Sequence, residues 1–295
     1  MKLTHLNRVL AGALVVNLGI CEAASPAIGI VTAKGAFRLN QATVVNNASL
    51  LEGAVIETAA VGSSMELSSG ARFSLAADSK GRFFGDRVVL EHGEGRLEKT
   101  AGLRIEARGL TIQPETGTAT GRIAVSGNAR VELAALTGSF RVLNSRGVVV
   151  ARLPAGLALA FEPQIAGVGG SVRLTGVLLN RGGHYLITDE TTNVTVEVVG
   201  PGLEKETGRR VEIVGVSDPT ATPVSDASQL VRIVSAKRLP NGGAATAGVG
   251  GTRGSGASGI ALSAGTVAVI GGVAVAAVIG GLAASGTLSQ GGLSR

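Results

Sequence analysis

The sequence predicts an all-β protein that follows an N-terminal signal peptide and ends in one C-terminal transmembrane helix. Three observations predict this fold class. Short segments alternate apolar and polar residues, with the period of a half-buried strand. Glycine is abundant, with 45 residues, and it favours tight turns over long soluble helices. Two continuous apolar runs, one near each end of the chain, interrupt this pattern.

The composition limits both the core and the partners. Hydrophobic residues make up 45% of the chain but aromatic residues only 2%, so we expect a core of Val, Leu, Ile and Ala. The formal net charge is +6. Basic and acidic residues alternate along the chain without a basic cluster, which is typical of a solvated surface and argues against nucleic-acid binding.

The first apolar run predicts a signal peptide over residues 1–24. Lys2 and Arg8 precede a short apolar stretch, and small residues follow it at 23–24, where we expect cleavage. An uncleaved membrane anchor and lipidation of Cys21 are the alternatives, although Ile20 is larger than the residue that normally precedes a lipidated cysteine. After cleavage the chain would contain no cysteine, which would exclude disulfides and thiol chemistry.

Residues 27–163 are predicted to form the first β domain. Alternation is clearest in six segments: 36–40, 64–67, 71–75, 103–107, 122–125 and 130–133. Turn-forming residues separate these segments, among them Asn47, Gly53, Gly70, Gly93, Gly95, Gly109, Gly127 and Gly147. A spacing of about ten residues per strand and turn predicts a sandwich, a barrel or a short β-roll.

The order of motifs in this segment resembles the FecR-like periplasmic domain. Four motifs carry the resemblance: residues 29–40, the Gly-x-x-Ile-x-Thr turn at 53–58, the paired segments at 64–75, and the strand at 88–97. The Gly-Thr-x-Phe strand of the family has no aromatic counterpart near 120–123. The resemblance implies an extracytoplasmic β domain that takes part in interactions. Members that relay a signal do so through a cytoplasmic N-terminal portion, where this chain has a predicted signal peptide.

Residues 168–239 are predicted to form a second unit. Strands at 171–180, 184–189, 194–199, 210–216 and 231–237, with one helical turn closed by Gly208, resemble a small OB-like β-barrel. Such barrels bind single strands through stacked aromatics and a positive groove. This segment offers only Tyr185 as an aromatic, so we expect a structural or protein-binding barrel.

A Gly-rich linker is predicted at 240–258, a transmembrane helix at 259–284 and a short tail at 285–295. Small residues at Gly265, Gly271, Gly272, Gly280 and Gly281 could allow two such helices to pair. The alternatives are that glycine is simply tolerated in this helix, and that the segment is a soluble Gly/Ala tail.

No catalytic, cofactor-binding or metal-binding motif is recognised. His92 is interpreted as a turn residue. His184, together with Asp189 and Glu190, could contact a cation at a hairpin end, but an exposed polar strand end is the preferred interpretation.

The predicted function is a non-catalytic protein of the cell envelope, anchored in the inner membrane with its β domains in the periplasm. It would act in interaction or assembly with envelope proteins, with homo-oligomers possible and no cofactor. A FecR-type signal-transmitting regulator and an envelope glycan-binding protein are the two alternatives. Scarce aromatics argue against the latter, because sugar rings usually stack on Trp or Tyr.

Overall fold

The computed structural model describes residues 26–240, except 128–129, 164–170 and 219, together with residues 267–270 and 273–277. Over these residues the chain forms strands β1 to β21 and one short 3₁₀ helix, η2. The all-β prediction is therefore confirmed. The signal peptide at 1–24, the tail at 285–295 and all of the linker but Pro240 lie outside the described residues.

The N-terminal part is a two-layered structure that we call the roll. It contains β1 to β14 together with β20 and β21. Two long strands, β1 (Ala27–Leu39) and β7 (Arg87–Lys99), belong to both layers and join them. A sandwich, a barrel and a roll were all compatible with the sequence, and the observed strand pairing is that of a roll whose two layers share these two strands.

The first layer runs in the order β1-β3-β6-β7-β8-β9-β12-β13. All of its neighbours are antiparallel except the parallel pair β7–β8. The strands that it adds to β1 and β7 are β3 (Ala54–Thr58), β6 (Lys80–Phe83), β8 (Arg104–Ala107), β9 (Leu110–Pro114), β12 (Phe140–Leu143) and β13 (Val149–Leu153).

The second layer runs in the order β1-β4-β5-β7-β10-β11-β14-β21-β20 and is antiparallel throughout. Its remaining strands are β4 (Ser63–Leu67), β5 (Arg72–Leu75), β10 (Thr120–Val125), β11 (Val131–Thr137), β14 (Ala158–Pro163), β20 (Val267–Ile270) and β21 (Val273–Ala277). Inward-facing apolar side chains of both layers form one core, and Phe73 of β5 contacts Phe83 of β6 across it with 6.0 Å between the ring centroids. The ten-residue strand β2 (Ala42–Leu51) pairs only with β1.

The second unit is a closed five-stranded barrel of order β15-β16-β17-β19-β18. It comprises β15 (Ser171–Arg181), β16 (His184–Thr188), β17 (Thr195–Val199), β18 (Arg210–Asp218) and β19 (Leu230–Arg238). Only the β17–β19 pair is parallel. η2 (Leu203–Glu206) forms the predicted helical turn, and Gly208 follows it with a φ of 76°. This barrel is consistent with the OB-like unit expected from the sequence.

The predicted transmembrane helix is wrong where the structure describes it. Within 259–284, β20 and β21 form an antiparallel hairpin, and β21 pairs with β14. Among the described residues the one helix is η2, and its four residues are too few to span a bilayer. Valine alternates with alanine here, and Val273 and Val275 are buried while Ala274 and Ala276 are half-buried, as in a strand with one face in the core. The five glycines proposed for helix pairing lie outside the described residues.

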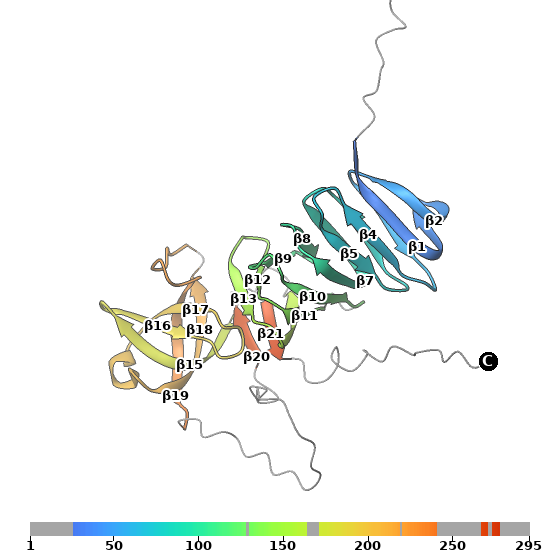
Figure 1. Cartoon of the computed structure of the whole chain (residues 1–295). Coiled ribbons are helices and arrows are strands. Elements are labelled where there is room, and N and C mark those ends of the chain that lie inside the picture. Colours follow the sequence, from blue (N-terminus) through green and yellow to red (C-terminus); the bar gives the residue numbers. More distant parts are fainter. Residues whose placement is uncertain are drawn as a thin grey trace, which may run out of the picture.

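The two ends of the roll differ in how their strand edges are covered (Figure 1). At one end the layers finish in β13 and β20, next to the barrel. The backbone N–H of Arg152 in β13 donates to the carbonyl of Thr192 at 2.8 Å, and β20 lies beside β15. At the other end lies the β1–β2 hairpin, and no described strand pairs with the outer edge of β2.

Candidate functional site

The outer edge of β2 is the candidate functional site. Its ten residues, Ala-Thr-Val-Val-Asn-Asn-Ala-Ser-Leu-Leu, include neither a charged residue nor a proline. Natural edge strands are normally protected from pairing by charge, proline or a covering segment. Among the described strands with a free edge, β13 and β20 are covered by the barrel, whereas β2 is not. β2 is therefore open to pairing with another strand.

The side chains of β2 separate into two faces. Leu50 is buried, and Val44 and Ala48 are half-buried against the core. The alternate positions point outward, and Val45 is 61% exposed. Ile30 of β1, which lies opposite Ser49, is 57% exposed. The free edge is thus accompanied by exposed apolar surface on the outer face of the same two strands.

A tight turn fixes the start of β2. Asn40 and Gln41, with φ values of 48° and 73°, connect β1 to β2. The Asn40 side-chain oxygen accepts the N–H of Val55 at 2.8 Å, and the Asn40 N–H donates to the Val55 carbonyl at 2.9 Å. These bonds hold the hairpin against β3. Both central residues adopt the left-handed conformation that a two-residue hairpin turn requires.

The turn expected at Asn47 is wrong, because Asn47 lies within β2 opposite Thr32. The irregular feature here is a bulge. The pairing moves from Thr32–Asn47 to Ala36–Val45, so three residues of β1 face the single residue Asn46, which has a φ of 71°. Asparagine tolerates the left-handed conformation in bulges as well as in turns, which explains why it resembled a turn signal in the sequence.

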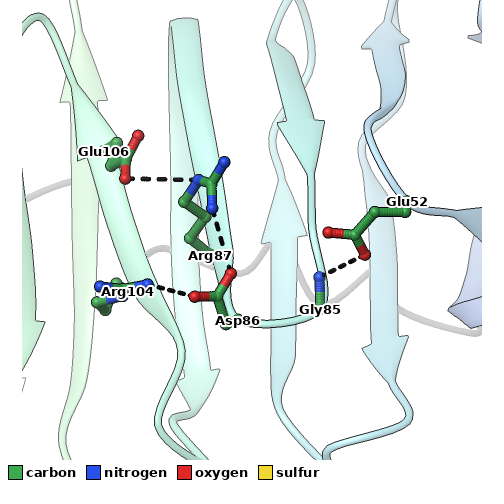
Figure 2. Close-up of polar contacts among 6 residues, drawn as sticks. All are labelled: Glu52, Gly85, Asp86, Arg87, Arg104 and Glu106. Atoms are coloured by element: carbon green, nitrogen blue, oxygen red, sulfur yellow. Dashed lines mark hydrogen bonds and ion pairs between the residues drawn. The ribbon is translucent and has the colours of Figure 1, made fainter.

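The end of β2 is held by the turn that follows it (Figure 2). A carboxylate oxygen of Glu52 accepts the N–H of Gly85 at 3.1 Å. The N–H of Gly53 donates to the carbonyl of Phe83 at 2.8 Å. These two bonds connect the β2–β3 turn to the end of β6 and the β6–β7 turn, so both ends of β2 are held by neighbouring segments and its edge is preformed.

Next to this contact lies a cluster of paired charges (Figure 2). Arg87 and Arg104 are directly opposite each other in the parallel β7–β8 pair, which alone would be repulsive. Asp86 accepts from both guanidinium groups, and Arg87 also pairs with Glu106 at 3.5 Å and lies 4.1 Å from the centroid of the Phe84 ring. Asp86 thus offsets the repulsion between the two arginines, and we assign the cluster a structural role.

A shallow hollow of about 300 Å³ lies beside the β1–β2 turn. Its lining combines both signs of charge: Arg38, Asn40, Gln41, Val55, Glu57, Lys80, Arg82 and Glu91. Glu91 pairs with Lys80 at 3.2 Å and with Arg82 at 3.7 Å. The mixed charge gives this hollow no preference for a strongly anionic or cationic ligand, but it provides a polar border close to the apolar edge.

The structure separates the three residues that could have shared a cation. The His184 Nδ1 atom lies 2.7 Å from a carboxylate oxygen of Glu197, a buried residue whose other oxygen accepts the N–H of Val224 at 2.9 Å. Asp189 is fully buried, and its carboxylate accepts hydrogen bonds from Thr175, Thr191 and Thr192. Glu190 instead pairs with Arg210, at 2.6 and 2.8 Å. These residues therefore hold the barrel together through separate contacts.

The pKa values of the adjacent carboxyl groups of Asp189 and Glu190 are shifted in opposite directions. Burial raises the pKa of Asp189, although hydrogen bonds from Thr175, Thr191 and Thr192 act against that rise. The hydrogen bonds from Arg210 lower the pKa of Glu190. Sequence reasoning missed the role of Asp189, because its position in a turn suggested an exposed side chain.

The other histidine within the described residues, His92, is not in a turn. It lies within β7 opposite Lys80 and precedes Gly93, which has a φ of 84° at an irregularity of that strand. Within the part of the chain that the structure describes, no group of three or more His, Cys, Asp or Glu residues is arranged to hold a metal ion.

No protein-family model matches the chain, and no curated protein matches it.

Proposed function

We propose that this chain is an exported, non-catalytic protein of the cell envelope that binds a protein partner by strand addition at β2. The observation that carries the proposal is the ten-residue edge of β2, which is uncharged, preformed and uncovered by any described strand. Added strands gain main-chain hydrogen bonds along such an edge, and exposed side chains next to it supply specificity.

The rest of the chain has supporting roles in this proposal. The roll would be a FecR-like domain and the barrel an OB-like domain that protects the opposite end of the roll. The apolar run at 1–24 motivates export, with the β units in the periplasm. The predicted membrane helix is not part of the proposal, because its described residues extend the sheet of the roll.

The charge pattern supports a non-catalytic role. The carboxylates with the clearest environments are engaged in structural contacts: Asp86 with two arginines, Asp189 with backbone N–H groups and Glu190 with Arg210. In each case the hydrogen-bonding capacity is used to hold strands or loops together.

The test is crosslinking of the full-length chain in its native envelope, followed by mass spectrometry of the captured partners. Val45→Lys places a charge on the proposed edge, as natural edge strands do to prevent pairing. Val234→Lys is the matched control, because Val234 of β19 is 74% exposed and lies in the closed barrel.

We expect Val45→Lys to lose at least one partner that both the wild type and Val234→Lys retain. Capture of the same partners at the same yield by all three proteins would contradict the proposal. Circular dichroism of both variants establishes that the comparison is made between folded proteins.

A further inference from the structure

We propose that the strand added at β2 is the β2 strand of a second copy of this chain, paired antiparallel about a two-fold axis. This inference rests on the proposed function and specifies its partner. In a two-fold dimer the same surface is used by both copies, so the surface must be complementary to itself.

The neutrality of β2 satisfies this requirement. Pairing a charged strand with its own copy can place like charges opposite one another, which is destabilising. β2 contains only Ala, Thr, Val, Asn, Ser and Leu. The neighbouring strands on both layers differ: β3 carries Glu57, β4 carries Glu66, and β1 carries Lys34 and Arg38. The charge pattern therefore permits self-pairing at β2.

The alternation of β2 also restricts the register. Residues directly opposite in an antiparallel pair lie on the same face of the sheet, so an outward-facing residue must oppose an outward-facing residue. With the axis at Asn47, the outward positions pair as Asn47 with Asn47, Val45 with Ser49, and Thr43 with Leu51. This register uses residues 43–51, nearly the whole strand.

Asn47 suits the position on the axis. Its amide has both donors and an acceptor, so two copies of the same side chain can hydrogen-bond to each other. Asn46, which faces the bulge of β1, would then oppose Ala48 of the second copy, next to the centre of the new ladder. Exposed Ile30 and Leu51 would extend one apolar face across both copies.

The first experiment reads the register by disulfide formation in the full chain carrying Cys21→Ser, which removes the single native cysteine. Across such a ladder, opposed side chains come close enough for a disulfide. We expect Asn47→Cys to form dimers on mild oxidation. Val45→Cys or Ser49→Cys alone should form few, whereas a mixture of these two variants should form many.

Val234→Cys is the control for random collision, because this exposed position lies in the barrel. Equal crosslinking of Val234→Cys and Asn47→Cys, or no crosslinking at any of the three β2 positions, would overturn the inference.

The second experiment distinguishes a second copy from any other occupant. Asn47→Lys and Asn47→Glu each place like charges opposite one another at the axis, so sedimentation should give a monomer for each variant alone and a dimer for the mixture. The wild type should dimerise over the same concentration series. A wild type that stays monomeric, or a mixture that stays monomeric, would overturn the inference.

Different results would contradict the proposed function and the self-pairing inference. If the wild type is monomeric but Val45→Lys still loses an envelope partner, another protein or another segment occupies β2. In that case the self-pairing inference fails and the proposed function stands. If wild type and Val45→Lys capture identical partners in the envelope, the proposed function fails.

Discussion

The roll and the barrel stabilise their folds by different means. The roll contains all six phenylalanines of the chain, and five of them fill its core: Phe37, Phe73, Phe83, Phe140 and Phe161. The described barrel has no phenylalanine, and its core is aliphatic. Both units bury polar residues, but among the described residues the two buried carboxylic acids, Asp189 and Glu197, belong to the barrel, which also buries Thr175, Thr191, Thr192 and Gln229.

The two units therefore differ in the contacts that define their cores and loops. In the roll, apolar side chains from two layers meet, so the strands themselves make the core. In the barrel, Asp189 accepts four hydrogen bonds from Thr175, Thr191 and Thr192 and so shapes the loop between β16 and β17. The same loop supplies the Thr192 carbonyl that contacts β13 of the roll. The buried acid therefore also positions the junction between the units.

The largest effect should come from removing an aromatic ring of the roll. Phe73 is fully buried, and its ring fills the space in which a side chain at Gly95 would otherwise lie. We expect Phe73→Ala to lower the free energy of unfolding by about 4 kcal/mol, measured by urea denaturation. Phe84→Ala, at a half-buried position, is the control. An equal loss of stability in both variants would show that the buried ring contributes no more to the free energy of unfolding than the half-buried one.

The corresponding change in the barrel is Asp189→Ala. It leaves the buried N–H groups of Thr175, Thr191 and Thr192 without their acceptor, so we expect a loss of about 3 kcal/mol. Asp226, whose side chain is 64% exposed, provides the control Asp226→Ala, which should change stability by less than about 0.5 kcal/mol. If the denaturation curves of Asp189→Ala and Asp226→Ala coincide, the buried acid does not stabilise the barrel in the way that we infer.

A smaller effect tests the C-terminal hairpin of the roll. Val275 is buried, so Val275→Thr places a hydroxyl in the core and should cost about 2 kcal/mol. The next residue, Ala276, is half-buried, and Ala276→Thr should be tolerated to within about 0.5 kcal/mol. Thermal unfolding of both variants checks this alternation; equal losses at the two positions would argue against a strand.

The smallest effect is a dependence on pH that has opposite signs at two adjacent acids. The raised pKa of Asp189 means that the folded state holds its proton more tightly. Its contribution to stability should therefore increase as the pH falls through that raised pKa towards 3.8. Glu190, whose pKa is lowered from 4.5, contributes stability above that value and loses it as the pH falls.

Urea denaturation from about pH 7 to about pH 3 separates these contributions. Relative to the wild type, Asp189→Ala should become less stable as the pH falls, whereas the deficit of Glu190→Gln should diminish. Parallel pH profiles for the two variants would contradict the opposite directions of the two pKa shifts.

Much of the fold could be predicted from the sequence because apolar and polar residues alternate along most strands. Each of the six segments proposed in the roll and the five in the barrel overlaps a strand, with ends that differ by at most a few residues. The C-terminal hairpin could not be recognised in this way. Valine and alanine are both apolar, so the alternation of β21 is invisible to a polar-versus-apolar reading and the run resembles a membrane span.

The candidate site was less accessible to prediction. The turn at Asn40 and Gln41 has no glycine or proline, and the two asparagines in the middle of β2 suggested a turn where the strand continues. The free edge itself is a property of the topology. Which strands lie beside β2 depends on pairings between distant segments, and local composition does not contain that information.

The C-terminal hairpin, β20–β21, also determines the order in which the strands of the roll can pair. Pro163 of β14 lies opposite Val273 of β21, although the whole barrel separates them along the chain. During synthesis the edge of β14 therefore has no native neighbour until the barrel has emerged and the hairpin follows. Closing so long a loop carries an entropic cost, and pairing between distant segments slows folding. Docking of this hairpin is thus expected to be a late event in folding, and until then the newly made roll exposes an open edge at each end.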